Sequence, residues 1–275
     1  AFATAILSAL ALLGAAGCRT PPETPSPDEF REGPALAASP FFEILTAPKG
    51  FDAQAALREA DATVEAVDRW LGARPLAPVC RVAILAPGDP AGVRYLDGGG
   101  DAGGRVFFET GVIVVQGAPD SPRLWTTLRH EAAHYALRRH TQKAPPFWLD
   151  EGVACLFEEG APPSGEPRVS PERLNLFRHL LGSRWPGAVG RLLGQSAPER
   201  ADGAAYARAW AMVFYLYHQD PGRVPALVRE LAASLSTQAF VDAQAGAAWT
   251  QDLERRMASW FERGVSFESL DAGGF

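Results

Sequence analysis

The stretch Arg129–His140 reads RHEAAHYALRRH, and it contains three of the five histidines in the chain. Within it, His130, Glu131 and His134 form the pattern H-E-x-x-H. Residues four apart lie one turn apart on the same face of an α-helix, so both imidazoles can reach one metal ion. A glutamate directly after the first histidine can act as general base on a water molecule at that metal. The stretch therefore predicts a helix with His130 and His134 as metal ligands and Glu131 as a catalytic residue.

A catalytic zinc site takes three protein ligands and leaves one position open for water, so one more ligand is required. His140 has the spacing of the last histidine in H-E-x-x-H-x-x-G-x-x-H, the metzincin pattern that this stretch resembles. That pattern needs its glycine to turn the chain sharply, whereas Leu137 stands here and favours a continued helix. On a continued helix His140 lies about 240° around the axis from His134. We therefore expect His140 to be a solvated residue near the helix C-terminus and not a ligand.

The second candidate for the third ligand lies in PPFWLDEGVACLFEE, residues 145–159. Trp148, Glu151, Gly152 and Ala154 resemble the W-x-x-E-G-x-A segment of gluzincins, the thermolysin-like and aminopeptidase-like zinc peptidases. In that family a second helix follows the H-E-x-x-H helix and supplies a glutamate ligand. The resemblance therefore implies that Glu151 completes a Zn²⁺ site. The chain also resembles the peptidase-MA-like proteins of bacteria, many of which are exported.

Two further positions are interpreted through the same resemblance. YARAW, residues 206–210, resembles the Y-x-x-G helix of aminopeptidase-like gluzincins, which implies that Tyr206 donates a hydrogen bond to the oxyanion. The alternative is that Tyr206 is a core residue of an aromatic helix. Cys155 stands where relatives often carry an acidic residue, one turn beyond Glu151. It either approaches the metal or packs against the first helix.

The first segment, AFATAILSALALLGAAGC, has no charged residue before Cys18. Its length and small residues predict a signal peptide over 1–17, and its end resembles a bacterial lipobox, in which Cys18 becomes lipidated. Residues 18–40 are rich in Pro, Ser and Glu and predict an extended tether. This organisation predicts a lipoprotein of the bacterial cell envelope, held at the membrane by its N-terminal lipid. A plain signal peptide or an uncleaved anchor is the alternative.

The rest of the chain divides into two parts. From 41 to 118, a strand at FFEIL, an amphipathic helix at 51–72 and strands at VCRVAILA, RVFFE and VIVVQG predict an α/β subdomain. From 119 to 265 helix patterns dominate, and 266–275 is a tail. This pattern predicts an α+β protein, and the gluzincin resemblance implies a zincin-like fold with its active site between the two subdomains. GGGDAGG, residues 98–104, leads into a strand and not a helix, so it does not predict a dinucleotide site.

The composition is that of an ordinary globular domain, with 47% hydrophobic and 21% charged residues. The net charge of −6 argues against nucleic-acid binding, which usually needs a basic face. Besides Cys18 the chain has Cys80 and Cys155. In an exported protein these two form either a disulfide or a pair of buried thiols.

These observations predict a zinc-dependent hydrolase, in the first instance a peptidase, that acts on a peptide or protein substrate. His130, His134 and Glu151 hold Zn²⁺, Glu131 activates the attacking water, and Tyr206 stabilises the oxyanion. By family analogy, a strand such as VIVVQG pairs with an extended peptide at the rim of the cleft. Two alternatives are open: a hydrolase acting on another kind of bond, and a non-catalytic lipoprotein that keeps the fold and the metal to bind a partner.

Overall fold

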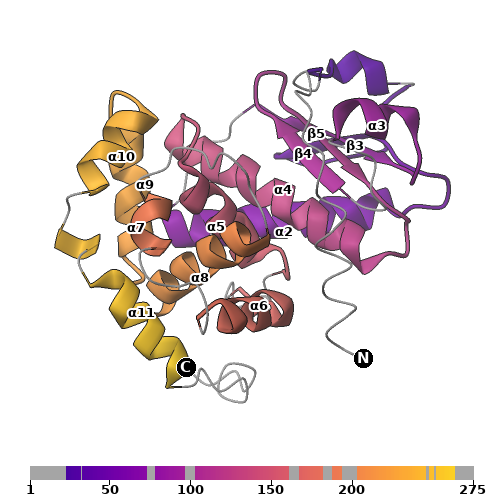
Figure 1. Cartoon of the computed structure of the whole chain (residues 1–275). Coiled ribbons are helices and arrows are strands. Elements are labelled where there is room, and N and C mark those ends of the chain that lie inside the picture. The colour runs from indigo at the N-terminus through magenta and orange to yellow at the C-terminus, as the bar shows by residue number, and fades with distance from the viewer. Residues whose placement is uncertain are drawn as a thin grey trace, which may run out of the picture.

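The computed structural model describes residues 23–31, 33–72, 78–96, 103–160, 167–181, 188–193, 203–245, 248–250 and 252–263. The predicted signal peptide, Cys18, the tail and most of the glycine-rich segment at 98–104 lie outside these residues. The described part is a small sheet followed by a mostly helical region, which confirms the predicted α+β class (Figure 1). Among the described helices, none combines the length and apolarity needed to cross a bilayer.

The sheet has five strands in the order β1-β2-β3-β5-β4. The three inner strands are parallel, and the two edge strands run antiparallel to their neighbours. Their bounds are β1 Ala37–Ala38, β2 Phe42–Thr46, β3 Cys80–Leu85, β4 Gly103–Phe107 and β5 Val112–Gln116.

The strand VIVVQG lies inside the sheet and not at its rim. β5 is hydrogen-bonded to β3 on one side and to β4 on the other, and all five of its residues are buried. The suggestion that this strand pairs with an extended peptide is therefore wrong. Its apolar sequence is that of a strand covered on both faces, and among the described strands the edges of the sheet are β1 and β4.

The two faces of the sheet are covered by different elements. One face packs against α2 (Ala53–Leu71) and α4 (Pro122–Thr141) and forms the large hydrophobic core. The other face forms a smaller core with a 3₁₀ turn, η1 (Pro27–Phe30), and with α3 (Pro90–Tyr95). Successive strand residues point to opposite faces of the sheet and pack into different cores. Those in the small core include Leu45, Ala83, Leu85, Val112 and Val114.

The structure differs from the expected tether between Ser26 and residue 40. Ser26 and Glu29 form a capping box at the start of η1, and Phe30 is only 6% exposed because it covers the small core. Further on, β1 pairs with β2. The polar composition of the segment predicts disorder on average, but one aromatic residue and a two-residue strand are enough to hold it against an otherwise open face.

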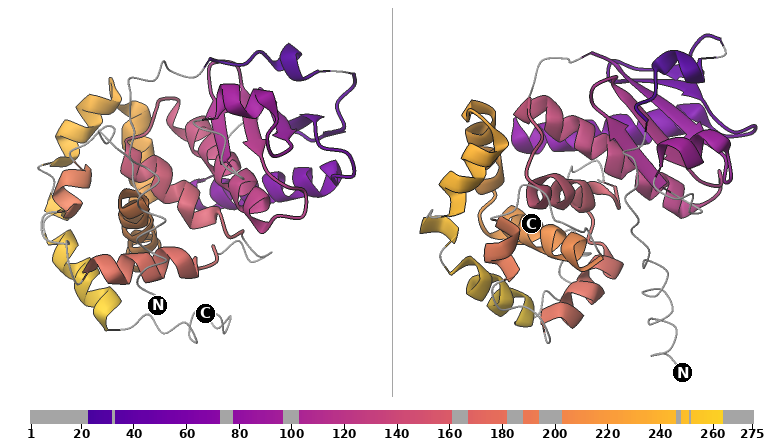
Figure 2. Two further views of the ribbon diagram at one scale, coloured as in Figure 1. Left: turned by 45° about the vertical axis from the view of Figure 1, so that its right-hand side comes forward. Right: turned by 45° about the horizontal axis from the view of Figure 1, so that its top comes forward.

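The helical region surrounds α5 (Phe147–Phe157), which packs between α4 and α8 (Gly203–Gln219). Figure 2 shows the later helices curving round this centre on the side away from the sheet. The sequence patterns missed the short helices α7 and α10. The remaining elements are α6 Pro171–Leu181, α7 Ala188–Leu193, α9 Arg223–Ala233, α10 Thr237–Ala245, η2 Ala248–Thr250 and α11 Leu253–Glu262.

Gly152, in the E-G-x-A segment, sits where α5 comes closest to α8. A Cβ atom at this position would overlap the Val213 side chain and would lie 2.7 Å from the backbone oxygen of Ala209. We expect Gly152→Ala to lower the free energy of unfolding by ~1–3 kcal/mol, because a helix backbone cannot move aside as a side chain can. Urea unfolding followed by circular dichroism measures the effect.

The matched control for this change is Gly190→Ala, also in a helix, because a Cβ atom there meets no neighbour within 4 Å. Alanine at that position should leave the urea concentration at the midpoint of unfolding unchanged or raise it slightly. Equal unfolding midpoints for wild type and Gly152→Ala would show that α5 does not pack closely against α8 at Gly152.

Candidate metal centre

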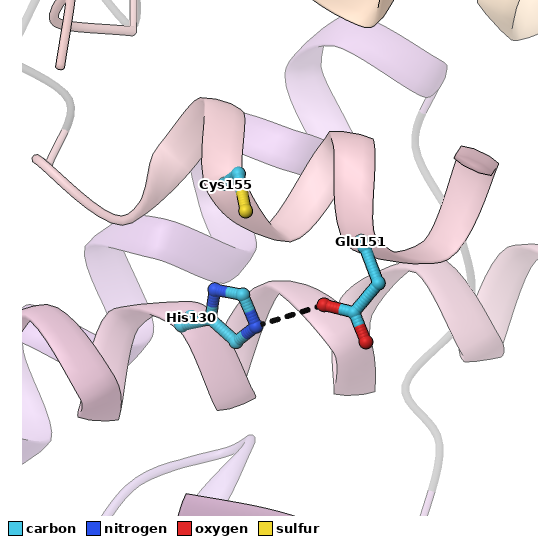
Figure 3. A group of neighbouring side chains, drawn as sticks. All are labelled: His130, Glu151 and Cys155. Atoms are coloured by element: carbon cyan, nitrogen blue, oxygen red, sulfur yellow. Dashed lines mark hydrogen bonds and ion pairs between the residues drawn. The ribbon is translucent and has the colours of Figure 1, made fainter. Parts of the chain in front are cut away.

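The three predicted ligands come together where α5 crosses α4. The Nε2 atom of His130 lies 3.2 Å from Oε2 of Glu151, and Nε2 of His134 lies 3.5 Å from the same oxygen. The two Nε2 atoms lie 3.1 Å apart. Figure 3 shows His130 and Glu151 reaching toward each other from the two helices. The i and i+4 spacing on α4 and the position of Glu151 one residue after the first turn of α5 produce this convergence.

A carboxylate holds the other ring nitrogen of each histidine. His130 Nδ1 lies 3.2 Å from Glu158 Oε2, and His134 Nδ1 lies 2.7 Å from Asp150 Oδ1. With each Nδ1–H donating to its carboxylate, each Nε2 presents a lone pair to the centre of the cluster. Two lone pairs and one carboxylate oxygen therefore face one another at short range, and that arrangement requires a cation.

The pKa values of the clustered side chains also indicate that the cluster needs positive charge. Burial opposes a charge on His130, but hydrogen bonds to Cys155, Glu151 and Glu158 raise its pKa well above the usual range. The pKa of His134 is also raised well above that range, because the carboxylates of Asp150 and Glu151 outweigh burial. Burial likewise opposes a charge on Glu151, yet the histidines hold its pKa far below the ordinary value. Without a metal, protons supply the positive charge that the cluster needs.

Cys155 lies next to this cluster. Ligand atoms of His130, Glu151 and Cys155 all lie within 4.8 Å of one another, so the group can hold a metal ion. Figure 3 shows the sulfur on the side of the His130 ring whose nitrogen does not bond to Glu151. The thiol is fully buried, and burial raises its pKa, so it remains protonated near neutral pH. Cys155 and Cys80 are both free, buried thiols, so the disulfide alternative is excluded.

Glu158 is held in turn by Arg173 of α6. The Nε and Nη2 atoms of Arg173 donate to the two carboxylate oxygens of Glu158 at 2.8 and 3.1 Å. The carboxylate beside Nδ1 of His130 comes from Glu158, directly after the last residue of α5. The sequence patterns did not select Asp150, Glu158 or Arg173.

Removing the charge of Glu158 is expected to weaken metal binding about 10–100-fold in Glu158→Gln, as is typical when a carboxylate behind a metal-bound histidine is lost. Competition against a chelating indicator measures this affinity. Glu159→Gln, one residue further along, is the control, because Glu159 forms no ion pair within the described residues. Equal affinities for the two variants would show that Glu158 does not orient His130.

Glu131 borders a cavity of about 240 Å³ together with the cluster. The lining also includes residues of β4, Phe108 just after it and Tyr206 of α8. Gly104 allows β4 to approach this closely, since a Cβ atom there would lie 2.8 Å from Oε1 of Glu131. Burial raises the pKa of Glu131 from its ordinary value, while the charges of His134 and His130 oppose that shift.

Tyr206 lies at the same cavity. Its ring makes an edge contact with Phe147 at 5.4 Å between centroids, and the Arg173 guanidinium carbon lies 5.7 Å from the ring centroid. Burial raises the pKa of Tyr206 to about 12, with a further contribution from the charge of Glu151. The phenol is therefore protonated at neutral pH and is able to donate a hydrogen bond into the cavity.

His140 is not solvated, and the expectation that it would be is wrong. It is 3% exposed, and its Nε2 lies 2.7 Å from Oδ1 of Asp68 on α2. Nη1 of Arg139 donates to the other oxygen of Asp68 at 3.1 Å. His140 does point away from the cluster, as a continued helix requires, but the surface it reaches is covered by α2.

Metal affinity is expected to fall as the pH is lowered. A metal binds only the neutral histidines, and the raised pKa values of His130 and His134 mean that protons compete at a higher pH than usual. At a pH below the pKa values of both histidines, each further pH unit should reduce the metal affinity by up to about 100-fold, because each of the two histidines must lose a proton before the metal binds. Titration with Zn²⁺ at a series of pH values tests this, and a pH-independent affinity would contradict histidine ligation.

The fold and the cluster together define an α+β protein with a group of His, Glu and Cys side chains that can hold a metal ion. Residues 125–238 match a family model described as "Protein of unknown function (DUF1570)". This stretch contains the H-E-x-x-H helix, the Glu151 segment and Tyr206. A comparison with curated proteins found no match.

Proposed function

We propose that this protein is a zinc-dependent hydrolase of the gluzincin type that cleaves peptide bonds. One observation carries the proposal: two histidine Nε2 atoms and one carboxylate oxygen converge within 3.5 Å, while carboxylates hold both Nδ1 hydrogens. A buried glutamate that is not needed as a ligand, Glu131, borders the same cavity. A peptidase needs both features, and a surface helix with two unrelated histidines needs neither.

The separations of the three atoms fit zinc. A tetrahedral zinc ion with bonds of about 2.0–2.1 Å holds its ligand atoms about 3.3–3.4 Å apart. The distances among the two Nε2 atoms and the Glu151 oxygen are 3.1, 3.2 and 3.5 Å. His130, His134 and Glu151 would therefore hold the ion without rearrangement, and the two-histidine, one-glutamate set leaves a position for water.

Zinc, when bound, supplies Lewis-acid activation of a water molecule and of the substrate carbonyl. Glu131 takes a proton from the attacking water and passes it to the leaving amine. Its raised pKa suits this role, since a base must hold the proton briefly and then release it. Tyr206 donates its phenolic hydrogen to the oxygen on which negative charge develops.

The edge strand β4 provides a place for an extended peptide. Its residues Gly104, Arg105 and Val106 line the cavity, and within the described residues the strand has a hydrogen-bonded neighbour on one side only. A substrate strand added to this edge would pass over the cluster, with its backbone held by the strand. The bound segment is therefore expected to be extended and not helical.

A non-catalytic zinc protein is the second candidate, and Cys155 is the observation that favours it. If the thiol joined the other three ligands, the site would have four protein ligands and no open position, as in structural zinc sites. Against this, the thiol is deeply buried with a raised pKa, and a structural site has no use for Glu131. The peptidase is therefore the proposed function.

The test uses the full chain and a peptide library analysed by mass spectrometry. Cleavage should require stoichiometric zinc, disappear after treatment with 1,10-phenanthroline and return when Zn²⁺ is added back. Bound zinc without cleavage of any peptide would overturn the peptidase proposal and favour the non-catalytic alternative. Cys155→Ser separates the two further, because a catalytic site retains its zinc in this variant and a four-ligand site loses it.

A further inference from the structure

A second cavity adjoins the one at the metal cluster. Val106 and Phe108, at the end of β4 and just beyond it, line both. The second cavity has a volume of about 360 Å³ and lies over the C-terminal half of α4, where Arg138 forms part of its wall. A chain bound at the cluster and running along β4 would therefore enter this space next.

Arg138 is four residues after His134, about one helical turn, so the two side chains lie on the same face of α4. The rise of an α-helix puts it about 6 Å further along the axis, which is the length of roughly two residues of extended peptide. Its guanidinium carbon lies 4.7 Å from the ring centroid of Phe108, a residue that belongs to both cavities. Arg138 is therefore within reach of a substrate side chain close to the cleaved bond.

The charge of Arg138 has no direct partner in the described part of the chain. Asp150 and Glu109 are near enough to act on it electrostatically, but neither forms an ion pair with it, and Asp150 is bonded to His134. Its neighbour Arg139, by contrast, is paired with Asp68. Burial lowers the pKa of Arg138, so those two carboxylates only partly offset the cost of desolvating its charge.

We propose that Arg138 and Phe108 form a substrate subsite for a carboxylate, so that the enzyme prefers an acidic group about two residues from the cleaved bond. A guanidinium offers paired N–H donors that match the two oxygens of a carboxylate, and the aromatic ring keeps its plane in place. The carboxylate comes either from a Glu or Asp side chain or from a peptide C-terminus. This subsite rests on the proposed peptidase function.

Binding is measured first, so that the result does not depend on turnover. The probes are short peptides that carry a hydroxamate to bind the zinc and that differ only in Glu or Gln two residues away, all with an amidated C-terminus. A Gln peptide with a free C-terminus separates the two sources of carboxylate. Calorimetry on the zinc-loaded wild type should show about tenfold tighter binding of the Glu peptide or of the free C-terminus.

Three variants locate the effect. Arg138→Gln should abolish the preference, and Arg138→Lys should keep only part of it, because lysine keeps the charge without the paired donors. Arg123→Gln, at an exposed position on the same helix, should leave the preference unchanged. In the peptide library, cut sites of the wild type should be enriched in acidic residues, and those of Arg138→Gln should not.

The outcomes distinguish the two proposals. Equal binding of all three peptides by the wild type, or a preference that survives in Arg138→Gln, overturns the subsite. Failure of every hydroxamate to bind zinc-loaded protein overturns the open zinc position that the peptidase proposal requires, and the subsite with it. A Glu preference in binding without any cleavage supports the subsite and contradicts the peptidase activity.

Discussion

Glu131→Gln is expected to reduce peptide hydrolysis by about 10²–10⁴-fold while the zinc content stays the same. Glutamine has nearly the same shape, so it fits the buried position, but its amide cannot take a proton from water. Glu131 borders the cavity with the ligands, and the three converging ligand atoms come from His130, His134 and Glu151. The loss should therefore appear in kcat and not in metal binding.

Turnover of a peptide identified in the library and zinc content by mass spectrometry are measured on the same preparation. Glu65→Gln, at an exposed position of α2, is the control for the change of charge. Full activity of Glu131→Gln would assign the base to another residue. Loss of zinc in that variant would mean that Glu131 is a ligand, and the assignment of Glu151 would then need revision.

Removing a ligand is expected to have the other large effect. His134→Ala and Glu151→Ala should each weaken zinc binding by well over 100-fold, beyond the ~10–100-fold typical of residues that only support a ligand. Each variant leaves two of the three converging atoms in place. The rise in melting temperature that zinc gives the wild type should disappear in both.

His140→Ala is the comparison that tests the choice between the two possible third ligands. It should leave zinc affinity unchanged and lower the free energy of unfolding by ~1–3 kcal/mol, because the half-buried Asp68 loses one of its two partners. Loss of zinc in His140→Ala, with zinc retained in Glu151→Ala, would reverse the ligand assignment. Indicator competition and urea unfolding give the two readouts separately.

The sequence predicts the ligand cluster because its geometry is local. His130 and His134 are one turn apart, and the break at Pro145 and Pro146 precedes a second helix. These local features are enough to predict that the three candidate ligands lie close together. The strands and most helices follow from apolar periodicity in the same way. The assignment of Glu151 also needed the gluzincin resemblance, since helix geometry argued against His140 but did not identify another ligand.

What the sequence does not predict depends on contacts between distant segments. Glu158 contacts both His130 on α4 and Arg173 on α6, and no spacing rule relates those positions. His140 has the polarity of a surface residue, and only the packing of α2 on α4 buries it. β5 could be assigned to the inside of the sheet only once the strand order was known, because a buried strand and an apolar edge read alike.

The link from Asp68 to Arg139 and His140 sets the rotational phase of α4. The same helix must present His130 and His134 to α5 at one end and Arg139 and His140 to α2 at the other. Insertion or deletion of one residue between His134 and Arg139 would turn these two ends about 100° relative to each other. Either the imidazoles or the Asp68 contacts would then be lost, so this part of α4 can change its side chains but not its length.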